Sequence, residues 1–311
     1  MKEYCFGIDV GGTTIKLGCF RTDGTLLDKW EIPTRIDDGG KAIIPDAARE
    51  VQEKMKELGI AHREVQGVGI GVPGPVNDNG EISRAVNLHW GYKNLVQEME
   101  EILELPVKAG NDANVAALGE MWQGAAKGCR NLIMVTLGTG VGGGIIVNGK
   151  IIAGAHGAAG EIGHACVEPK ETQRCNCGNY GCLEQMAAAT GIVRLANKEL
   201  SASDEDSLLR RERVTAKTVF DAYKQQDALA SRVVRRFGEY LGNALAIFSC
   251  VVDPERIVIG GGVSKAGDVV VSAIEPYFRR DAFPACKNIP IVLATLGNDA
   301  GIYGTAKLVV D

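Results

Sequence analysis

The feature that most constrains the fold of this chain is a pattern of strands and glycine turns that occurs twice. An apolar run over residues 4–10 ends in Gly-Gly-Thr at 11–13, and residues 131–136 lead in the same way to Gly-Thr-Gly at 138–140. In each half two further extended runs follow, and an Asp-Gly or Asn-Gly pair separates them. Such a pair between extended segments indicates a β-hairpin turn. Both halves therefore predict the order strand, glycine turn, strand, hairpin turn, strand.

The order of the motifs further along the chain is also repeated. Residues 67–72 and 257–263 are apolar runs that contain glycines, and the letters Gly-Asn-Asp-Ala occur at 110–113 and again at 297–300. Each copy of Gly-Asn-Asp-Ala follows a predicted strand and precedes a predicted helix. Several motif pairs in the same order indicate an internal duplication. The second half is longer, and its extra residues include a cluster of histidine and cysteines.

Helices are predicted between the strands. Apolar residues recur at helical spacing over 43–58 and again over 237–248, before Asp253-Pro254 stops the second helix. Strands that alternate with helices favour mixed sheets covered by helical layers. We therefore expect an α/β fold with two related lobes and a cleft between them. The small lobe is expected to comprise residues 1–112 and 300–311, and the large lobe residues 113–299 with the insertion.

The charge balance argues against nucleic acid as a partner. The chain has 34 lysines and arginines against 39 aspartates and glutamates, a formal net charge of −5, and no block of basic residues. Proteins that bind phosphate backbones cluster lysine and arginine. No apolar run approaches the roughly 18 residues of a membrane-spanning helix, and the N-terminus does not resemble a signal peptide. We therefore expect a cytoplasmic protein that binds neither nucleic acid nor membranes.

The glycine-rich turns are candidates for phosphate binding. The chain has no Walker A sequence, and although Gly138-x-Gly140-x-x-Gly143 fits the dinucleotide pattern, a hairpin rather than a helix follows it. We therefore reject a Rossmann site. The turns could simply close tight hairpins. Two glycine turns in matched positions nevertheless favour a split phosphate clamp, because glycine lets backbone N–H groups approach phosphate oxygens closely.

Side chains beside these turns would complete a nucleotide site. Lys16 could add positive charge, and Asp9 could hold the Mg²⁺ that accompanies ATP, through water. A further glycine turn near 261 would border the adenosine. The residues expected at ATP are Asp9, Gly11, Gly12, Thr13, Thr14, Lys16, Gly138, Thr139, Gly140, Gly261 and Gly262.

Three of the nine cysteines form a cluster with a histidine in the insertion. His164, Cys175, Cys177 and Cys182 have the spacing H-x10-C-x-C-x4-C. Three thiolates and one imidazole suit tetrahedral Zn²⁺, and a full set of four protein ligands indicates a structural site. Buried free thiols are the alternative, and the glycines interleaved in this polar loop argue against it. Cys166 is a possible substitute ligand.

Three segments carry a resemblance to a known family. The sequence DVGGTTIK at 9–16 resembles the phosphate loop of the ROK sugar kinases, and AGEIGH at 159–164 and CNCGNYGCLE at 175–184 are similar to the two signatures of that family. The resemblance covers the whole chain in order, and it is strongest to the bacterial glucokinases. It implies the two-lobed, actin-like (duplicated ribonuclease H-like) ATPase fold. The family's DNA-binding repressors carry an additional N-terminal helix-turn-helix domain, which we do not expect here. His156 departs from the family, which often has asparagine there.

The resemblance implies a reaction and a catalytic base. It implies ATP-dependent phosphorylation of glucose at the 6-hydroxyl, with Asp112 as the general base. From the residues alone, a carboxylate that merely begins a helix is an alternative for Asp112, and that structural role fits its twin Asp299 better. By resemblance, the hexose is surrounded by Gly74, Asn87, Asn111, Asp112, Glu161, His164 and Glu184.

Several alternatives stay open at this point. The acceptor could be N-acetylmannosamine, N-acetylglucosamine, mannose or fructose, because the zinc and base motifs are shared within the family. The phosphoryl donor could be polyphosphate instead of ATP. A more distant alternative is a sugar-sensing regulator that has lost turnover. A homodimer is expected by resemblance only.

Overall fold

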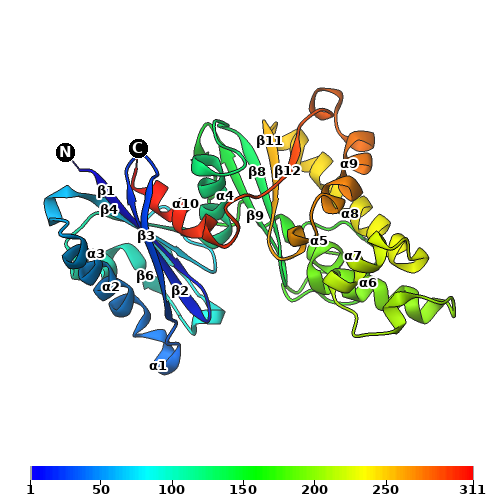
Figure 1. Ribbon diagram of the computed structural model, residues 1–311, viewed down its shortest axis with the longest axis horizontal. Helices are drawn as coiled ribbons and strands as arrows, with labels where there is room; N and C mark the ends of the chain where they lie inside the picture. The colour runs from blue at the N-terminus through cyan, green and yellow to red at the C-terminus, as the bar shows by residue number, and fades with distance from the viewer. Residues whose placement is uncertain (1, 311) are drawn as a thin grey trace. The chain divides into compact units, whose positions relative to one another are not determined.

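The computed structural model describes residues 2–310, and two five-stranded sheets form its framework (Figure 1). The first has the strand order β3-β2-β1-β4-β7 and the second the order β10-β9-β8-β11-β12. In both sheets the central strand pairs antiparallel with its hairpin partner and parallel with the strand on its other side. The duplicated strand pattern and the α/β fold class expected from the sequence are therefore confirmed.

The first sheet consists of β1 (Tyr4–Val10), β2 (Thr14–Arg21), β3 (Leu26–Pro33), β4 (Val65–Val72) and β7 (Val107–Asn111). Strands β1 and β4 are buried along almost their whole length, whereas the burial of the edge strand β3 alternates residue by residue. This difference follows from position, because a central strand covered on both faces needs a continuous apolar run. A separate two-stranded ribbon pairs β5 (Glu81–Ile82) with β6 (Lys93–Asn94).

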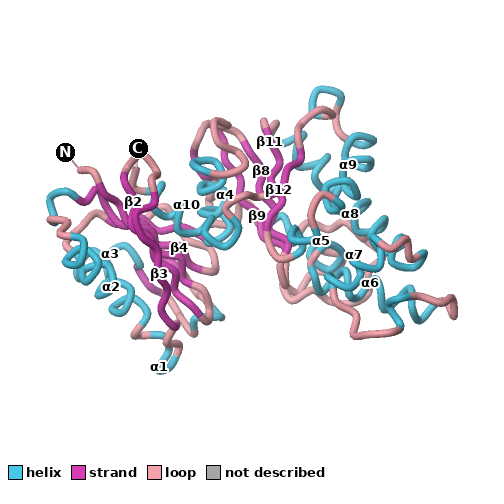
Figure 2. The backbone as a smooth tube through the Cα atoms, viewed as in Figure 1, coloured by secondary structure: helices cyan, strands magenta, loops and turns pink. Residues whose placement is uncertain are grey.

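The second sheet consists of β8 (Leu132–Leu137), β9 (Val141–Val147), β10 (Lys150–Ile151), β11 (Arg256–Gly260) and β12 (Ile291–Leu293). Its two outer strands, β10 and β12, are shorter than their counterparts β3 and β7 in the first sheet. Strands β8, β11 and β12 pair in parallel, as β1, β4 and β7 do. The second sheet therefore has the topology of the first, but its outer strands are shorter. Figure 2 shows both sheets in magenta with helices in cyan.

Helices cover both faces of the first sheet. One buried core packs α2 (Ile43–Leu58) and α3 (Leu95–Leu103) against it, and α1 (Asp37–Gly40) precedes α2. The other face is covered by α4 (Asp112–Gln123) and α10 (Ala300–Leu308). Helix α2 matches the predicted range, and it ends where Gly59 takes the left-handed conformation, with φ of 67°.

Helices α4 and α10 cross at very close range. A side chain on Gly304 would overlap the carbonyl of Val115, and one on Gly119 would overlap the carbonyl of Ala300. Glycine at both positions lets the two backbones meet directly. This crossing fixes the start of α4, which carries Asp112, relative to the C-terminal segment.

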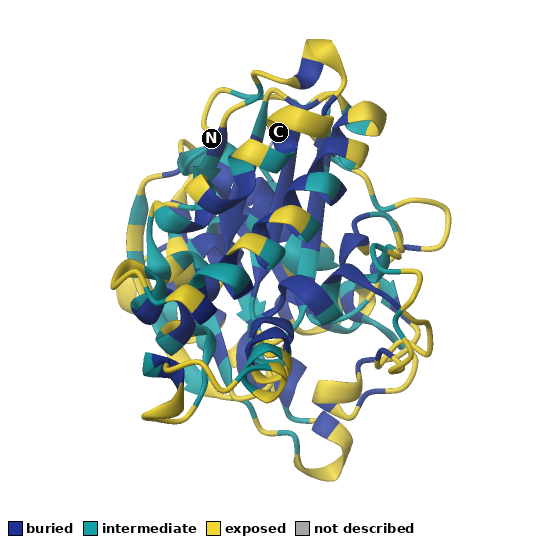
Figure 3. Cartoon of the chain, turned by 90° about the vertical axis from the view of Figure 1, so that its right-hand side faces the viewer, coloured by how far each residue is buried: buried dark blue, intermediate teal, exposed yellow. Residues whose placement is uncertain are grey.

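The second sheet packs against a single large core with five helices, α5 (Leu183–Ala187), α6 (Ala189–Ala202), α7 (Ala216–Lys224), α8 (Ala228–Val252) and α9 (Val269–Asp281). The predicted helix over 237–248 is the middle of α8, which ends at Asp253 in a left-handed conformation with φ of 47°. Figure 3 shows the strands as dark blue, buried ribbons and the peripheral loops as yellow, exposed ones.

Contacts within the chain define two compact units. The first contains residues up to 128, residues 149–159 and those from 295 onwards, and the second contains 129–148 and 160–294. The boundaries expected from the sequence lay at 112/113 and 299/300. The structure instead groups all of α4 with the first unit, because α4 packs on α10 and on β4 and β7. Among residues 2–310, no helix combines the length and the apolar run required to cross a membrane.

Candidate active site and metal cluster

The predicted site residues of the first unit gather at one edge of its sheet. Asp9 of β1 lies opposite Gly71 of β4, and Val72 of β4 lies opposite Asn111 of β7. Because these strands are parallel, the turns that follow them leave the sheet at the same edge, as ligand-binding turns of open α/β sheets do. The side-chain amide of Asn111 donates to the carbonyl of Gly74 at 3.1 Å, so two residues expected at the sugar are in direct contact.

Asp112 is the first residue of α4, but Asn111 is the residue that caps the helix. The Asn111 side-chain oxygen accepts from the backbone N–H groups of Ala113 at 3.0 Å and Asn114 at 3.2 Å. Asp112 is exposed, and its Oδ1 also accepts from the Ala113 N–H, at 2.8 Å. Asn111 is therefore the N-cap of α4, so the structural role of beginning the helix does not by itself account for Asp112.

The twin residue, Asp299, lies in a different local structure. It ends a 3₁₀ turn (Gly297–Asp299) ahead of α10 and makes no side-chain cap bond. Its carboxylate instead pairs with the Lys29 ammonium at 2.5 Å. The two Gly-Asn-Asp-Ala copies thus share a sequence, yet only the first joins a strand directly to a helix.

Asp9 is surrounded by groups that act on its charge. Burial raises the pKa of Asp9, the negative charge of Asp112 raises it further, and Lys16 lowers it, with a net pKa of about 6. Lys16 is the direct cross-strand partner of Asp9, and its Nζ donates to the carbonyl of Asn298 at 3.0 Å. A carboxylate with a pKa near neutrality gains when a cation arrives beside it, so Asp9 is suited to holding Mg²⁺.

The first glycine turn is fixed by its neighbours. Gly11 N donates to the carbonyl of Thr14 at 3.0 Å, and the Thr34 hydroxyl donates to the carbonyl of Gly11 at 2.7 Å. Asn87, in the 3₁₀ turn Val86–Leu88, lies beside Gly12, where a Cβ on that glycine would be 3.7 Å from the Asn87 carbonyl. The first unit therefore brings Asn87 close to the first glycine turn, two parts of the chain for which the sequence predicts sugar and phosphate binding.

The second unit repeats this arrangement with its own glycine turns. Gly260 of β11 pairs with Thr136 of β8, so the turns after both strands leave the sheet side by side. Gly261, with φ of 84°, packs against the backbone of Leu137 so closely that no Cβ would fit. The turn at 138–140 and the glycines at 261–262 thus share one edge, as expected for a nucleotide site.

The turn at 138–140 accepts hydrogen bonds from α6, and the strand that follows it donates one to α5. The Thr190 hydroxyl donates to the carbonyl of Thr139 at 2.9 Å, and Ala189 N donates to the carbonyl of Gly138 at 2.9 Å. On the other side, Oε2 of Glu184 accepts from Val141 N at 3.1 Å. These hydrogen bonds fix the backbone of the turn.

The four residues of the predicted metal site come together. The ligand atoms of His164, Cys175, Cys177 and Cys182 all lie within 4.8 Å of one another. Cys177 Sγ and Cys182 Sγ are 3.6 Å apart, and Cys175 Sγ is 3.8 Å from His164 Nδ1. Ligands of a tetrahedral zinc with Zn–S bonds of about 2.3 Å would be separated by about 3.8 Å. The donor set and its spacing are therefore compatible with structural zinc. Cys166 is exposed and is not part of the group.

The loop that supplies the thiolates depends on local backbone geometry. Cys175 N donates to the carbonyl of Asn179 at 2.8 Å, which closes a tight turn around Gly178. Gly178 and Gly181 have φ of 96° and 68°, a conformation that favours glycine. Cys182 directly precedes α5, and α5 carries Glu184. A predicted metal ligand and a predicted sugar-binding residue therefore lie at the start of the same helix.

His164 presents its two ring nitrogens to different groups. It ends the 3₁₀ turn Ile162–His164, with Nδ1 facing Cys175 and Nε2 3.9 Å from Oε2 of Glu161. A ligating histidine commonly uses its second nitrogen to bond an outer group. The sequence placed His164 both at the metal and at the sugar, and one imidazole in this orientation can serve both.

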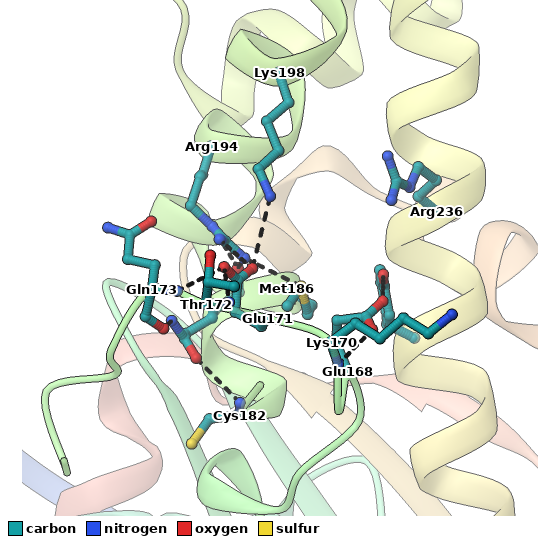
Figure 4. A network of polar contacts seen from close by, with 12 residues as sticks. Glu168, Lys170, Glu171, Thr172, Gln173, Cys182, Met186, Arg194, Lys198 and Arg236 are labelled. Carbon is teal, nitrogen blue, oxygen red and sulfur yellow. Dashed lines mark hydrogen bonds and ion pairs between the residues drawn. The ribbon is translucent and has the colours of Figure 1, made fainter. Parts of the chain in front are cut away.

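A buried ion cluster that the sequence did not predict supports the metal loop (Figure 4). The Glu171 carboxylate has a side chain only 5% exposed, and it pairs with Arg194 at 2.5 Å and Lys198 at 3.6 Å. Arg194 also donates to the carbonyl of Gln185, at 2.9 Å. Gln185 donates to the carbonyl of Gln173 and accepts from Cys182 N. These residues are distant in sequence and no motif links them, so only the fold reveals the cluster.

The cluster predicts a measurable contribution to stability. Burial alone would raise the pKa of Glu171, but the Gln173 N–H, Arg194 and Lys198 lower it to about 2. Because the folded pKa lies below the ordinary value of 4.5, the stabilisation is present above that pH and is lost as the pH falls toward 2. We expect Glu171→Gln to lower the free energy of unfolding by about 2–3 kcal/mol at pH 7 and by progressively less below pH 4.5.

Urea denaturation followed by circular dichroism measures this effect. The control is Glu275→Gln, which removes a more exposed helix pair with Arg279 and should cost no more than about 1 kcal/mol. Equal losses for the two variants at pH 7 would show that the Glu171 cluster is not the support inferred for the loop.

Taken together, the fold is the two-lobed, actin-like ATPase fold, with predicted site residues on the carboxyl-terminal edges of both sheets. The chain belongs to the ROK family, whose model matches residues 5–311. This agrees with the family resemblance of the three sequence motifs.

Known proteins similar to this chain include enzymes and a regulator. A glucokinase of Halalkalibacterium halodurans is 46% identical over 309 residues, which cover 97% of this chain and 94% of the relative. The DNA-binding transcriptional dual regulator NagC of Escherichia coli K12 is 36% identical over 96% of this chain and 73% of the relative. The crystal structure of a ROK family glucokinase from Streptomyces griseus, in complex with glucose and AMPPNP, is 33% identical with a TM-score of 0.76, and the match covers 98% of both chains.

Proposed function

We propose that this protein transfers the γ-phosphoryl group of ATP to the 6-hydroxyl of glucose. The observation that carries the proposal is the position of Asp112, whose carboxylate begins α4 at the same sheet edge as the glycine turn at 11–14. Its charge raises the pKa of Asp9, so the two carboxylates act on the same region of the first unit. The similarity to glucokinases, and to a structure that holds glucose and AMPPNP, selects the reaction and the sugar.

In the proposed reaction, Asp112 removes the proton from the 6-hydroxyl as that oxygen bonds to the γ-phosphorus. The bond between that phosphorus and the bridging oxygen breaks, and ADP leaves. Backbone N–H groups of the turns at 11–14 and 138–140 would hold the phosphates. Mg²⁺, when bound with the triphosphate, neutralises its charge, and Asp9 would hold that ion through water.

Two of the residues proposed for the sugar hold each other within the first unit. Asn111 and Gly74 are already fixed to each other, and Asn111 is in turn fixed by capping α4. Their preorganisation lowers the entropic cost of binding the hydroxyl groups. The full set proposed for the sugar is Gly74, Asn87, Asn111, Asp112, Glu161, His164 and Glu184. Its grouping rests on the family signatures.

Zinc is the metal proposed for the cluster of His164, Cys175, Cys177 and Cys182. The spacing of the ligand atoms supports it, and three thiolates with one imidazole exclude the oxygen-preferring ions Mg²⁺ and Ca²⁺. When bound, zinc would supply no reactive position, because four protein ligands complete its coordination. Its role would be to hold the loop that leads into α5, and through it Glu184.

We also propose a homodimer, which light scattering would test.

The position of Asp9 leads to a prediction about Gly301. The carboxylate of Asp9 lies against the first turn of α10, in space that a side chain on Gly301 would occupy. We expect Gly301→Ala to push Asp9 out of place and to lower kcat/KM for Mg²⁺-ATP by about tenfold to a hundredfold. Steady-state kinetics at saturating glucose would measure the loss. Gly91→Ala is the matched control, since no atom lies within 4 Å of a Cβ built there. Unchanged ATP kinetics in the Gly301 variant would contradict this role for the contact.

Acceptor identity is tested by coupled ADP release across a panel of sugars. The panel contains glucose, mannose, fructose, N-acetylglucosamine and N-acetylmannosamine, each with Mg²⁺-ATP. With polyphosphate as the donor no ADP forms, so the sugar phosphate is measured instead. Fastest turnover with glucose and ATP is the expected result. A preference for an acetylated sugar would keep the mechanism and replace the acceptor. No turnover with any sugar or donor would reject the kinase and favour the sugar-sensing regulator, the more distant alternative; the similar protein NagC is a transcriptional regulator.

A further inference from the structure

Glu120, in the third turn of α4, is a fully buried carboxylate that the reaction scheme does not use. Its side chain has 0% exposure. Within residues 2–310, its partners are backbone amides and a hydroxyl rather than a lysine or arginine. They are Ala125 N at 2.7 Å, Leu296 N at 2.8 Å, Thr295 N at 3.2 Å and Thr295 Oγ1 at 3.3 Å. A buried carboxylate without these donors would be strongly unfavourable, so the four hydrogen bonds are what makes its burial possible.

The partners of Glu120 lie where the chain passes between the two units. The chain leaves the first unit after Gly128 and returns to it at Thr295. Ala125 lies three residues ahead of the first passage, and Thr295 and Leu296 are the first two residues after the return. The Glu120 carboxylate therefore links α4 to these two connections, the one that follows Ala125 and the one that ends at Thr295. Two further passages flank residues 149–159.

The surroundings of Glu120 are built to keep the carboxylate in this position. Gly124 has no side chain, and a Cβ there would overlap Oε2 of Glu120. The main chain of Glu120 also accepts from Gly124 N at 3.1 Å and Ala126 N at 3.0 Å, which closes the end of the helix. At the other end of the same helix stands Asp112, the proposed base, and the crossing with α10 at Gly119 lies next to Glu120.

We propose that Glu120 is a positioning residue that anchors both connections, so that glucose bound by the protein tightens the binding of the nucleotide. This inference rests on the proposed function. Hinge positions in kinases absorb the backbone change when lobes close on a substrate, and the binding of one substrate then affects the binding of the other through a coupling free energy. In Glu120→Gln, an NH₂ group replaces an acceptor and faces backbone N–H donors. One of the two connections then loses its anchor.

Calorimetry of AMPPNP binding with Mg²⁺, measured with and without glucose, tests the proposal. In the unaltered protein we expect glucose to lower the Kd for AMPPNP about tenfold, and in Glu120→Gln by less than about twofold. Gly124→Ala keeps the carboxylate and displaces it, so it should lose the coupling as well. Asp46→Asn is the control, because Asp46 is another buried carboxylate of the first unit, paired with Arg35 and Arg49 instead. It should lower stability and keep the tenfold ratio.

The outcomes separate the inference from the function on which it rests. A folded Glu120→Gln protein that keeps the full ratio would overturn the inference, as would an unaltered protein with active turnover but no tightening by glucose. A loss of coupling in Asp46→Asn as large as in Glu120→Gln would reduce Glu120 to a general stabilising residue. If the unaltered protein releases no ADP with any sugar, the proposed function fails and the inference falls with it.

Discussion

Replacing Asp112 with alanine or asparagine is expected to lower kcat by roughly 10²–10⁴-fold while leaving the protein folded. Asn111 caps α4 through its own side chain, so the helix does not depend on the Asp112 carboxylate. The exposed position of Asp112 makes a large loss of stability unexpected. Steady-state ADP release and thermal denaturation, measured on the same preparations, check both parts of the prediction.

The internal duplication supplies a matched control for this experiment. Asp299 occupies the same place in the second Gly-Asn-Asp-Ala copy, but it pairs with Lys29 and stands in a 3₁₀ turn. We expect Asp299→Asn to retain activity within about threefold and to lose no more than about 1 kcal/mol of stability. Near-normal turnover by Asp112→Ala would reject its role as the base. Comparable losses in both variants would mean that the two aspartates act through structure.

The second large effect is expected from removal of the metal. Chelation, or replacement of Cys177 by serine, should reduce the zinc content from one ion per chain to nearly none. It should also weaken glucose binding by about a hundredfold. The physical reason is that the metal loop leads directly into α5, where Glu184 accepts from Val141 N beside the second glycine turn. Elemental mass spectrometry gives the zinc content, and calorimetry gives the glucose affinity independently of turnover.

Cys166→Ser provides the comparison for the metal experiment. Cys166 is exposed and stands outside the group of four ligands, so this variant should keep both its zinc and its glucose affinity. A zinc-free protein with full glucose affinity would refute the coupling between metal and sugar. Loss of zinc in Cys166→Ser would instead place Cys166 among the ligands.

Much of the fold could be predicted from the sequence because the motifs that reveal the repeat are local. Glycine turns and Asn-Gly or Asp-Gly pairs depend on local backbone geometry, which neighbouring residues determine. The range 43–58 was predicted closely for α2 because its apolar residues recur at helical spacing. The last of the extended runs expected in the second half is a short strand, since β10 covers only Lys150–Ile151. An edge strand extends only as far as the neighbouring strand pairs with it. The length of the edge strand therefore depends on its partner and cannot be predicted from its own residues.

The two Gly-Asn-Asp-Ala copies show where sequence comparison stops. Identical letters predict the same local structure, but the first copy leads directly from β7 into α4 while the second forms a separate turn before α10. The tertiary contacts of each copy, including Lys29 with Asp299, decide the difference. The grouping of His164, Cys175, Cys177 and Cys182 could be predicted because a tetrahedral zinc site requires a fixed set of residue types.

Glu120 and Glu171 were not predicted as parts of any site. Each is a single acidic residue within an ordinary stretch of helix or loop, and each acquires meaning only from partners far away in the chain. Thr295, one of the partners of Glu120, is 175 residues away, and Arg194 lies 23 residues from Glu171. Long-range polar contacts of this kind leave no periodic signal in the sequence.

The most direct test of the central claim is identification of the product by phosphorus NMR after incubation with Mg²⁺-ATP and glucose. The unaltered protein should give glucose 6-phosphate and ADP in equal amounts, and Asp112→Ala should give neither above background. Phosphate without a sugar phosphate, or phosphorylation at another hydroxyl, would contradict the proposed reaction.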